Sequence, residues 1–506
     1  MTKPSRLEIL VVVLILSVAA FFRFYHLDQT PPGLYPDEAM NGSNALIANA
    51  TGDYKIFYTE NNGREGLFIN LQAFSIKLFG IHPWALRGVS AVIGVLTVLG
   101  LYLLVRELFE RRIAALCAFL LAISFWHVNF SRIGFRAIMV PLILVYLYYF
   151  LWRGLKTGRW FPYFLAGLLT GLGFYTYTAY RVAPLITIIV FMNYWWYVKR
   201  TFSHENYTHA RMQLIRGFCL LMITAFFVAL PMGIFVLWHP DQITPQPYLS
   251  VFGQAEPIKA LWDSVIHTLG MFSFAGDGNQ RHNIAGAPML GWPLGILFII
   301  GFFKELGHWL SRKHGAFSPV HTLLFSWFFV MLLPGFLSIQ APHALRTIGV
   351  IPVAIIFVGR GLWWVFRAIG NWYDAYHPDH PYQQEHTVSP AAIWALVILL
   401  FSFAVYEYTR YFNTWAKDPL TAQAFNADYT AIAGEINQLP AGAAKYVIIE
   451  AEGVIALGLP VPAETVMFLT NSATPETQEA RNIHYLTADQ ARGFHFPSGS
   501  KIFYLR

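Results

Sequence analysis

Residues 7–25 read LEILVVVLILSVAAFFRFY. This run is long enough to cross a bilayer as a helix, which takes about 20 mostly apolar residues. It ends in aromatic side chains and lacks the small-residue cleavage site of a signal peptide. The sequence therefore predicts that residues 7–25 form a retained membrane span.

The whole chain shares the composition of this span. Of its 506 residues, 56% are hydrophobic and 12% are charged, whereas soluble domains carry roughly 25% charged residues. So little polar surface excludes a soluble enzyme, and the same figures exclude a disordered chain, a coiled coil and collagen. The two cysteines, Cys117 and Cys219, lie inside apolar runs, which leaves no disulfide framework and no cysteine-rich metal site.

About eleven apolar segments are long enough to be candidate membrane spans. Segments 113–131 and 291–303 are the weakest, because the first trails into polar residues and the second is short. The predicted fold is an α-helical polytopic membrane protein with spans near residues 7–25, 86–105, 113–131, 137–152, 160–178, 182–198, 217–238, 291–303, 319–338, 347–366 and 390–407.

Lysine and arginine in short loops indicate the orientation of the spans. With the N-terminus in the cytoplasm, most short-loop basic residues fall on the cytoplasmic side. The net charge of +7 is then largely a topological signal and no evidence for nucleic-acid binding. The predicted cytoplasmic residues include Lys3, Arg6, Arg106, Arg111, Arg112, Arg153, Lys156, Arg159, Lys199, Arg200, Arg211, Arg216, Lys304, Arg312, Lys313 and Arg367.

Three large segments then lie on the outer face, namely residues 26–85, 239–290 and 408–506. The last segment changes composition and predicts a small α/β extracytoplasmic domain, separate from a membrane module of residues 1–407. Its predicted elements are a helix over 420–439, strands over 445–450, 465–470 and 501–505, and a capping box at Thr487–Gln490 that opens a short helix.

Acidic residues avoid the predicted spans and gather in the outer segments. A coupled transporter usually needs ionisable groups near the middle of the membrane, and often broken spans in two corresponding halves. Neither pattern is present in the sequence. A site at the outer surface is favoured, while a transporter or lipid flippase remains the alternative class.

The first outer segment predicts two helices, over residues 37–49 and 65–79. The second helix is amphipathic and would lie along the membrane interface. Together they would hold Asp37, Glu38 and Glu65 at the mouth of the bundle. The structural alternative for Asp37 and Glu65 is capping or dipole pairing at a helix start. The apolar face of the second helix consists of Leu67, Leu71, Phe74 and Leu78.

Tyr35-Pro-Asp-Glu38, soon after the first span, resembles the Asp-Glu motif of membrane C-type glycosyltransferases, the GT-C fold. The similar branch contains the protein O-mannosyltransferases and the lipid A aminoarabinose transferases. Arg64–Phe68 stands where that branch opens its second interfacial helix, although Glu65-Gly66 replaces the usual prolines. Segments 87–109, 129–134 and 345–352 also resemble this branch, so the resemblance covers the membrane part in layout and specifies the superfamily better than the substrate.

This resemblance implies a polyprenyl-phosphate-linked sugar donor and a lipid, glycan or protein acceptor on the outer face, with inversion at the sugar. It implies Asp37 as the base, with Glu38 and Glu65 positioning the acceptor or the sugar. A divalent metal ion bridging Asp37 and Glu65 is compatible with it but not required. We expect contact with membrane lipids and location in the cytoplasmic membrane of a bacterium, because no long lumenal domain lies between the later spans.

The chemistry of such a transfer requires a carboxylate base, cationic groups at the departing phosphate, and an apolar groove for the lipid chain. Four arginines near the outer ends of predicted spans are candidates for the phosphate. The alternative for each one is snorkelling to the interface. These candidates are Arg132, Arg136, Arg181 and Arg346.

The second large outer segment contains a Gly-rich polar stretch, residues 274–283, after a predicted amphipathic helix over 258–272. Asp277, Arg281 and His282 would contact the sugar or acceptor if this stretch forms a flap, and a glycine-set surface turn is the alternative. His343, beside Arg346, is a further candidate for this contact. Trp126 and His127 are interpreted as interfacial anchors, and the histidine-rich residues 376–386 as a solvated loop.

Overall fold

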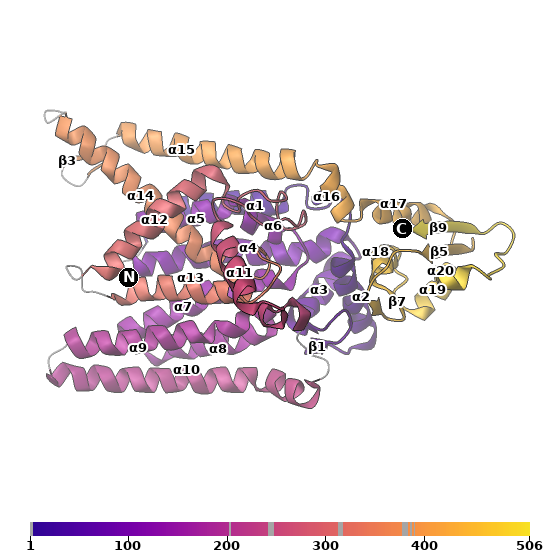
Figure 1. Ribbon diagram of the computed structural model, residues 1–506, viewed down its shortest axis with the longest axis horizontal. Helices are drawn as coiled ribbons and strands as arrows, with labels where there is room; N and C mark the ends of the chain where they lie inside the picture. The colour runs from indigo at the N-terminus through magenta and orange to yellow at the C-terminus, as the bar shows by residue number, and fades with distance from the viewer. Residues whose placement is uncertain are drawn as a thin grey trace.

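The computed structural model describes residues 4–201, 204–240, 247–311, 317–376, 383–384, 387–388 and 390–506. Long helices run along the long axis of the molecule, and a smaller α/β part lies at one end (Figure 1). Nine helices within these ranges are long and apolar enough to cross a membrane. They are α1 (Arg6–Phe24), α4 (Pro83–Leu108), α7 (Met139–Thr157), α9 (Pro184–Thr201), α10 (His204–Trp238), α12 (Gly291–Leu310), α13 (Pro319–Phe336), α14 (Ile351–Tyr376) and α15 (Pro390–Tyr408), some extended by a 3-10 or π turn.

Two other predicted spans coincide with shorter helices, α5 (Arg111–Ile123) and α8 (Trp160–Leu172), of 13 residues each. Helix α5 packs among α1, α4 and α14, and α8 packs against α7 and α10. After α5 the chain turns at Ser124 into α6 (Phe125–Phe130). Trp126 and His127 on α6 are fully buried, so their interpretation as interfacial anchors is wrong.

The first outer segment forms α2 (Pro36–Thr51), a two-stranded hairpin of β1 (Phe57–Tyr58) and β2 (Arg64–Glu65), and α3 (Gly66–Phe79). Both predicted helices are confirmed. Leu71, Phe74 and Leu78 on α3 are exposed, and Leu67 is half-buried. An exposed apolar stripe of this kind is typical of a helix that lies in a membrane interface.

The second outer segment contains η5 (Pro247–Leu249), η6 (Val251–Gly253) and the predicted amphipathic helix α11 (Pro257–Gly270). Helix α11 packs on η6 and α13 and leaves Ile258, Trp262 and Ile266 exposed. Residues 271–290 follow without a helix and fold back on themselves. Met271 and Met289 are fully buried, and the Met289 N–H donates to the Met271 carbonyl oxygen at 2.9 Å.

The last long helix does not end at the predicted residue 407. It continues from α15 as a π-helix over Thr409–Trp415, so residue 408 lies inside one continuous helix. The tail after it contains α16 (Pro419–Ala424), α17 (Ala427–Gln438), β5 (Lys445–Ile449), β6 (Ile455–Ala456), β7 (Leu459–Pro460), η10 (Val461–Ala463), α18 (Glu464–Leu469), α19 (Pro475–Arg481), β8 (Ile483–Thr487), α20 (Ala488–Ala491) and β9 (Lys501–Leu505).

A three-stranded parallel sheet in the order β8-β5-β9 forms the centre of the tail. Residues of α17 and α18 cover one face of this sheet. The predicted strands over 445–450 and 501–505 and the capping box at Thr487 are confirmed. The strand predicted over 465–470 is wrong, because these residues form most of α18, and the predicted helix over 420–439 is broken at Asn426, whose φ is 50°.

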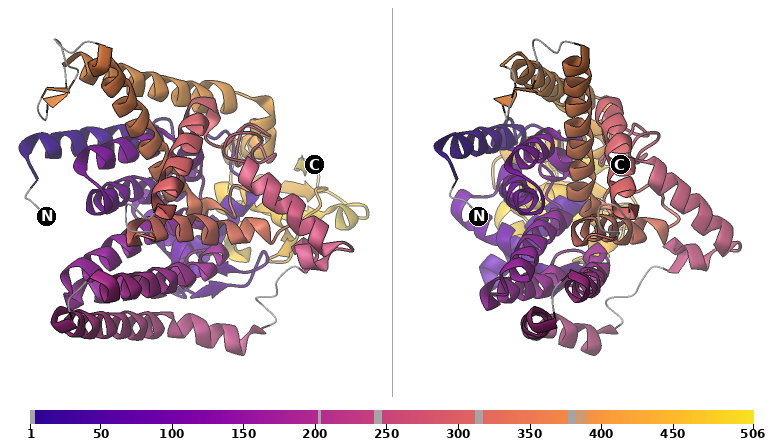
Figure 2. Two further views of the ribbon diagram at one scale, coloured as in Figure 1. Left: turned by 60° about the vertical axis from the view of Figure 1, so that its left-hand side comes forward. Right: turned by 90° about the vertical axis from the view of Figure 1, so that its left-hand side faces the viewer.

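The tail rests directly on α2, between the helical bundle and the sheet (Figure 1). The Thr465 hydroxyl donates to the Leu34 carbonyl oxygen at 2.9 Å, and the Leu34 N–H donates to the Thr430 hydroxyl at 3.0 Å. Phe468 is fully buried against α2, where a Cβ on Gly42 would lie 2.5 Å from its ring. Viewed along the bundle, the tail lies behind the helices rather than beside them (Figure 2).

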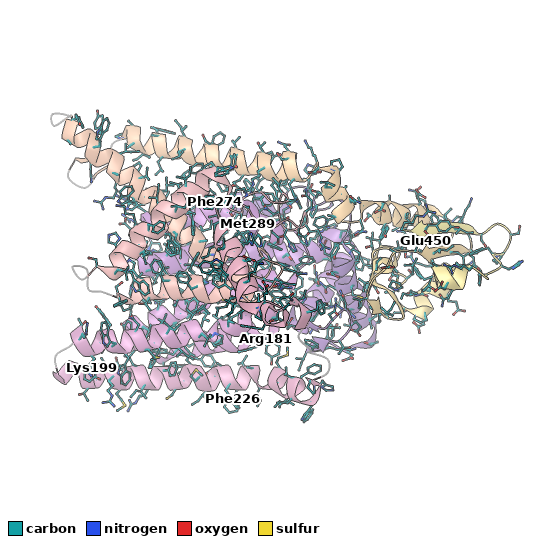
Figure 3. All side chains as sticks on the ribbon, in the orientation of Figure 1. Arg181, Lys199, Phe226, Phe274, Met289 and Glu450 are labelled. Atoms are coloured by element: carbon teal, nitrogen blue, oxygen red, sulfur yellow. The ribbon has the colours of Figure 1, made fainter. Side chains whose placement is uncertain are left out.

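The predicted cytoplasmic and outer groups lie at opposite ends of the molecule. Lys199, at the end of α9, lies near the end that carries the N-terminus, whereas Glu450 lies in the tail at the other end (Figure 3). The molecule is therefore a multi-pass membrane protein, and its tail lies at the end away from the N-terminus (Figure 1).

Candidate active site

A cavity of about 890 Å³ lies where the first outer segment meets η3 (Thr178–Val182), residues 271–290 and the turn between α13 and α14. Its wall is largely polar. It contains six of the eleven site residues predicted from the sequence, namely Asp37, Arg136, Arg281, His282, His343 and Arg346, and several polar residues that were not predicted. The polar wall includes Tyr35, Asp37, Asn41, Asn61, Arg64, Arg136, Tyr177, Arg281, His282, Gln340, His343 and Arg346.

Asp37 lies in the first turn of α2 and lines this cavity. The N-cap position is Tyr35 and carries no side-chain capping bond, so the capping interpretation of Asp37 is wrong. Asp37 Oδ1 accepts a hydrogen bond from Asn61 Nδ2 at 2.7 Å. Its carboxylate is half-exposed, which leaves it open to a molecule in the cavity.

Arg64 reaches the cavity from β2. Its guanidinium donates to Asn41 Oδ1 and Asn44 Oδ1, both at 2.5 Å, and these two amides lie one turn apart on α2. Burial, helped by the nearby positive charge of Arg136, lowers the pKa of Arg64 to about 10. The sequence reasoning used Arg64 only as part of a motif, although its place next to Glu65 was the available signal.

Glu65 is buried between two predicted phosphate ligands. Arg136 Nε lies 2.6 Å from Glu65 Oε2, and Arg181 Nη2 lies 3.8 Å from Oε1. The Arg136 guanidinium also lies over the Tyr177 ring, 5.3 Å from its centroid. Arg136 lines the cavity, whereas the buried Glu65 and the half-exposed Arg181 do not.

Two further guanidinium groups complete the cationic wall. Arg281 lies over the Tyr35 ring, 4.0 Å from its centroid. Arg346 donates to Ser338 Oγ and to Gln340 Oε1, and burial lowers the pKa of Arg346. Four arginines, Arg64, Arg136, Arg281 and Arg346, thus line the cavity that Asp37 also lines. Such a set of forked donors suits an anionic phosphate.

Asp277 connects the two histidines of the wall. His282 Nδ1 lies 2.9 Å from Asp277 Oδ2, and His343 Nδ1 lies 4.0 Å from the same oxygen. Burial is the largest single influence and opposes ionisation of Asp277, but the hydrogen bond and charge of His282, together with His343 and the Asn279 N–H, outweigh it, and the net pKa of Asp277 is lowered. Burial and the neighbouring His282 lower the pKa of His343 to about 3, so this ring is neutral.

Glu38 and Arg132 do not reach the cavity. Glu38 is fully buried in a two-point ion pair with Arg87, with both distances 3.0 Å, and accepts the Gly134 N–H at 2.7 Å. Arg132 is also fully buried. Its Nη atoms donate to carbonyl oxygens at the end of α1 and in the following turn, including those of Phe22 and Thr30, so it neither faces the cavity nor snorkels to the interface.

Two sets of three side chains within the described ranges could hold a metal ion, Asp277/His282/His343 and Glu305/His308/His321. Neither set includes Asp37 or Glu65, and both Glu65 oxygens are occupied by arginines. The residues predicted to bridge a metal are thus not brought together as a ligand set. The histidine-rich residues 377–380 and His386 lie outside the described part of the chain.

Sequence comparison finds one family model and one related protein. A model of the dolichyl-phosphate-mannose-protein mannosyltransferase family matches residues 67–212. The putative mannosyltransferase YkcB of Bacillus subtilis is 24% identical over 195 residues, which are 36% of this chain and 26% of YkcB. The chain therefore spans about a quarter of the length of this curated relative.

Solved structures resemble nearly the whole chain. The apo oligosaccharyltransferase of Archaeoglobus fulgidus has a TM-score of 0.54 at 14% identity, covering 92% of this chain and 64% of that protein. ArnT from Cupriavidus metallidurans, bound to undecaprenyl phosphate, has a TM-score of 0.55 at 16% identity, covering 94% of this chain and 89% of ArnT. At these identities the likeness concerns the fold. The chain has the GT-C fold that the sequence predicted.

Proposed function

We propose that this chain, with its GT-C fold, is a glycosyltransferase that takes a sugar from a polyprenyl-phosphate-linked donor. The acceptor would be a lipid, glycan or protein at the outer face of a bacterial cytoplasmic membrane. One observation carries the proposal, namely that Asp37 and four arginines line the same cavity. A carboxylate base and a cationic phosphate site are the two groups that this transfer requires.

In the proposed reaction, Asp37 removes the proton of the acceptor nucleophile. The new bond to the anomeric carbon forms as the bond to the phosphate oxygen breaks, and the electron pair leaves with the polyprenyl phosphate. A single displacement of this kind inverts the anomeric centre. Arg64, Arg136, Arg281 and Arg346 would neutralise the departing phosphate.

Glu65 and Glu38 have positioning roles in this proposal. Glu65 fixes Arg136 by the 2.6 Å ion pair, and Glu38 fixes the first turn of α2 through Arg87. The apolar side of the cavity includes Leu249, Pro334 and Leu337. Leu337 is also exposed, so an apolar wall continues from the cavity to the surface, where a polyprenyl chain could enter.

The solved relatives support a lipid-linked donor. A crystal structure of ArnT contains undecaprenyl phosphate, and a structure of the archaeal oligosaccharyltransferase AglB is a complex with an inhibitory peptide and a dolichol phosphate. The family model that matches this chain is named for a dolichyl-phosphate-mannose donor. Polyprenyl-phosphate mannose is therefore the first donor to test.

The test uses the purified full chain, radiolabelled polyprenyl-phosphate mannose and membranes of cells that lack the protein as the source of acceptor. Asp37→Asn should lower the initial rate of transfer at least roughly 100-fold, the usual contribution of a positioned base. Asp53→Asn is the matched control, because Asp53 is exposed beyond the end of α2 and does not line the cavity. Full transfer by the Asp37→Asn variant would contradict the assigned base.

The alternative function, transport or lipid flipping without transfer, is tested in cells. Lipid mass spectrometry of cells without the protein should detect an accumulated polyprenyl-linked sugar, which would also identify the donor if it is not mannose. An unchanged pool of such lipids, together with no transfer in vitro, would favour the alternative.

A further inference from the structure

We propose that Asp277, His282 and His343 form a zinc site whose fourth position opens into the cavity. These residues come from two separate segments, the 271–290 segment and the turn between α13 and α14. The proposal concerns other residues than the Asp37 and Glu65 pair for which a metal was considered from the sequence. The role of the zinc rests on the proposed function, whereas zinc binding itself is tested independently of it.

The ligand geometry suits a small tetrahedral ion. One ligand atom from each of the three side chains lies within 4.8 Å of the others. The individual separations include 2.9 Å between His282 Nδ1 and Asp277 Oδ2, and 4.0 Å between His343 Nδ1 and the same oxygen. Zinc binds nitrogen and carboxylate oxygen at about 2.0–2.2 Å, so small movements of the His343 ring would bring the three atoms around one ion.

The carboxylate is already held as a metal ligand requires. Asp277 is 4% exposed, its Oδ1 accepts the Asn279 N–H at 2.8 Å, and its Oδ2 accepts the Ala344 N–H at 2.8 Å. These two backbone donors come from the two segments that supply the histidines. Hydrogen bonds of this kind fix the orientation of a ligand and are a regular part of protein metal sites.

The fourth position is open on the cavity side, because both His282 and His343 line the cavity. Three protein ligands with one open position are the arrangement of catalytic zinc, whereas structural zinc is closed by four. Arg281 and Arg346 line the cavity beside the histidines. They would draw an anionic oxygen to the ion, so the ligand class of the open position is a phosphate oxygen.

The competing interpretation is a hydrogen-bonded Asp277–His282 pair that holds no metal. The second candidate set, Glu305/His308/His321, provides a comparison within the same chain, because it also combines one carboxylate with two histidines. There Glu305 Oε1 is bound by Arg360 Nε at 2.7 Å and Oε2 by His321 Nε2 at 2.9 Å. A guanidinium on the ligand carboxylate disfavours a cation, so we expect the zinc at Asp277 alone.

The experiment measures the zinc content of the purified full chain by mass spectrometry after equilibration with zinc and removal of the free ion. The wild type should hold one zinc per chain. His282→Gln and His343→Gln should each reduce this at least tenfold, while His321→Gln should leave it unchanged. A wild type without zinc, or zinc kept by both cavity variants, would overturn the proposal, as would loss of zinc only in His321→Gln.

A second measurement does not depend on the variants folding. The wild type is loaded with Co²⁺, and its visible spectrum is recorded before and after addition of inorganic phosphate. A change in the cobalt bands is expected if the open position takes a phosphate oxygen, and unchanged bands at saturating phosphate would contradict the open site. Asp37→Asn should lose transfer and keep zinc, so failure of the metal site and failure of the proposed function give different results.

Discussion

At the scale of single residues, the arrangement around Glu65 explains how a cationic group is held at the cavity wall. Glu65 is 1% exposed and ion-paired to Arg136 at 2.6 Å, while Arg181 approaches it less closely, at 3.8 Å. A guanidinium without this partner could turn away from the wall. In the proposed transfer, the Glu65 carboxylate would therefore act through Arg136 and would not touch the substrate.

Glu65→Gln should weaken donor use more than catalysis. The amide cannot replace the charge, and a hydrogen bond to a charged group contributes about 1.5–3 kcal/mol, which corresponds to a kcat/KM for the donor about tenfold to a hundredfold lower. Most of the loss should appear in KM, measured from initial rates over a range of donor concentrations. Arg181→Gln is the control and should change little, since the partly exposed pair contributes about 0–1 kcal/mol. Equal losses in both variants would contradict this reading of Glu65.

The different environments of the neighbouring acids Asp37 and Glu38 could not be predicted from the sequence. The motif predicted both residues at the start of a helix, and only the packing of that helix shows that their side chains have different surroundings. Consecutive helix positions point in different directions, so Asp37 lines the cavity and Glu38 is buried against Arg87. Arg132 was misjudged for the same reason, because the carbonyl groups that bind it come from α1, about a hundred residues away in the chain.

At the scale of elements, the start of α3 accounts for the departure of this chain from the proline-rich motif of the similar family. Gly66 donates its N–H to the Ile56 carbonyl oxygen at 2.7 Å, which closes the hairpin of β1 and β2. A Cβ at Gly66 would collide with the Lys55 carbonyl oxygen. Proline has neither the N–H nor the space it would need here.

Gly66→Pro should therefore destabilise the first outer segment, although it restores the family pattern. The lost hydrogen bond alone costs about 1–3 kcal/mol where the acceptor stays buried, and the collision adds to this. The expected result is a lower Tm in detergent and faster proteolysis within residues 52–66. Gly88→Ala is the control, because a Cβ there meets no neighbour within 4 Å. A Gly66→Pro variant with the wild-type Tm would show that the hairpin does not need this bond.

Long elements with a clear pattern were predictable and short buried ones were not. Apolar periodicity and length identified the membrane helices, α3 and α11. The segment predicted as a strand, residues 465–470, is rich in residues that favour strands. It forms α18 because Phe468 packs under α2 while Val466 and Met467 pack on the sheet, a two-sided burial that the sequence alone does not reveal.

At the scale of the whole molecule, the tail and the membrane part meet at the helix that carries Asp37. Glu464 at the start of α18 is 1% exposed at this contact. Burial raises the pKa of Glu464 to about 7, although Ser43 on α2 and Arg64 favour its charge. The contact between the tail and α2 therefore contains a carboxyl group, that of Glu464, which is neutral at moderately acidic pH.

The free energy of unfolding should fall as the pH rises from about 4.5 to 7. Between about pH 4.5 and 7 the unfolded chain releases the proton of Glu464 while the folded chain keeps it, which favours unfolding. Glu464→Gln removes this penalty, worth roughly 3 kcal/mol for such a shift. Its Tm should exceed that of the wild type above pH 7 and match it below pH 4.5, whereas the exposed Glu479→Gln should follow the wild type throughout. Parallel pH curves for Glu464→Gln and wild type would contradict the prediction.

The exposed apolar face of α3 has a consequence for the kinetics of the whole reaction. Leu71, Phe74 and Leu78 would anchor the first outer segment at the bilayer surface, and the cavity with it. In the proposed reaction, a lipid-linked donor would then reach Asp37 by lateral diffusion within one leaflet. The rate of the proposed transfer per protein molecule would accordingly depend on the mole fraction of donor among the lipids. Diluting the same vesicles with buffer would leave this rate per molecule unchanged.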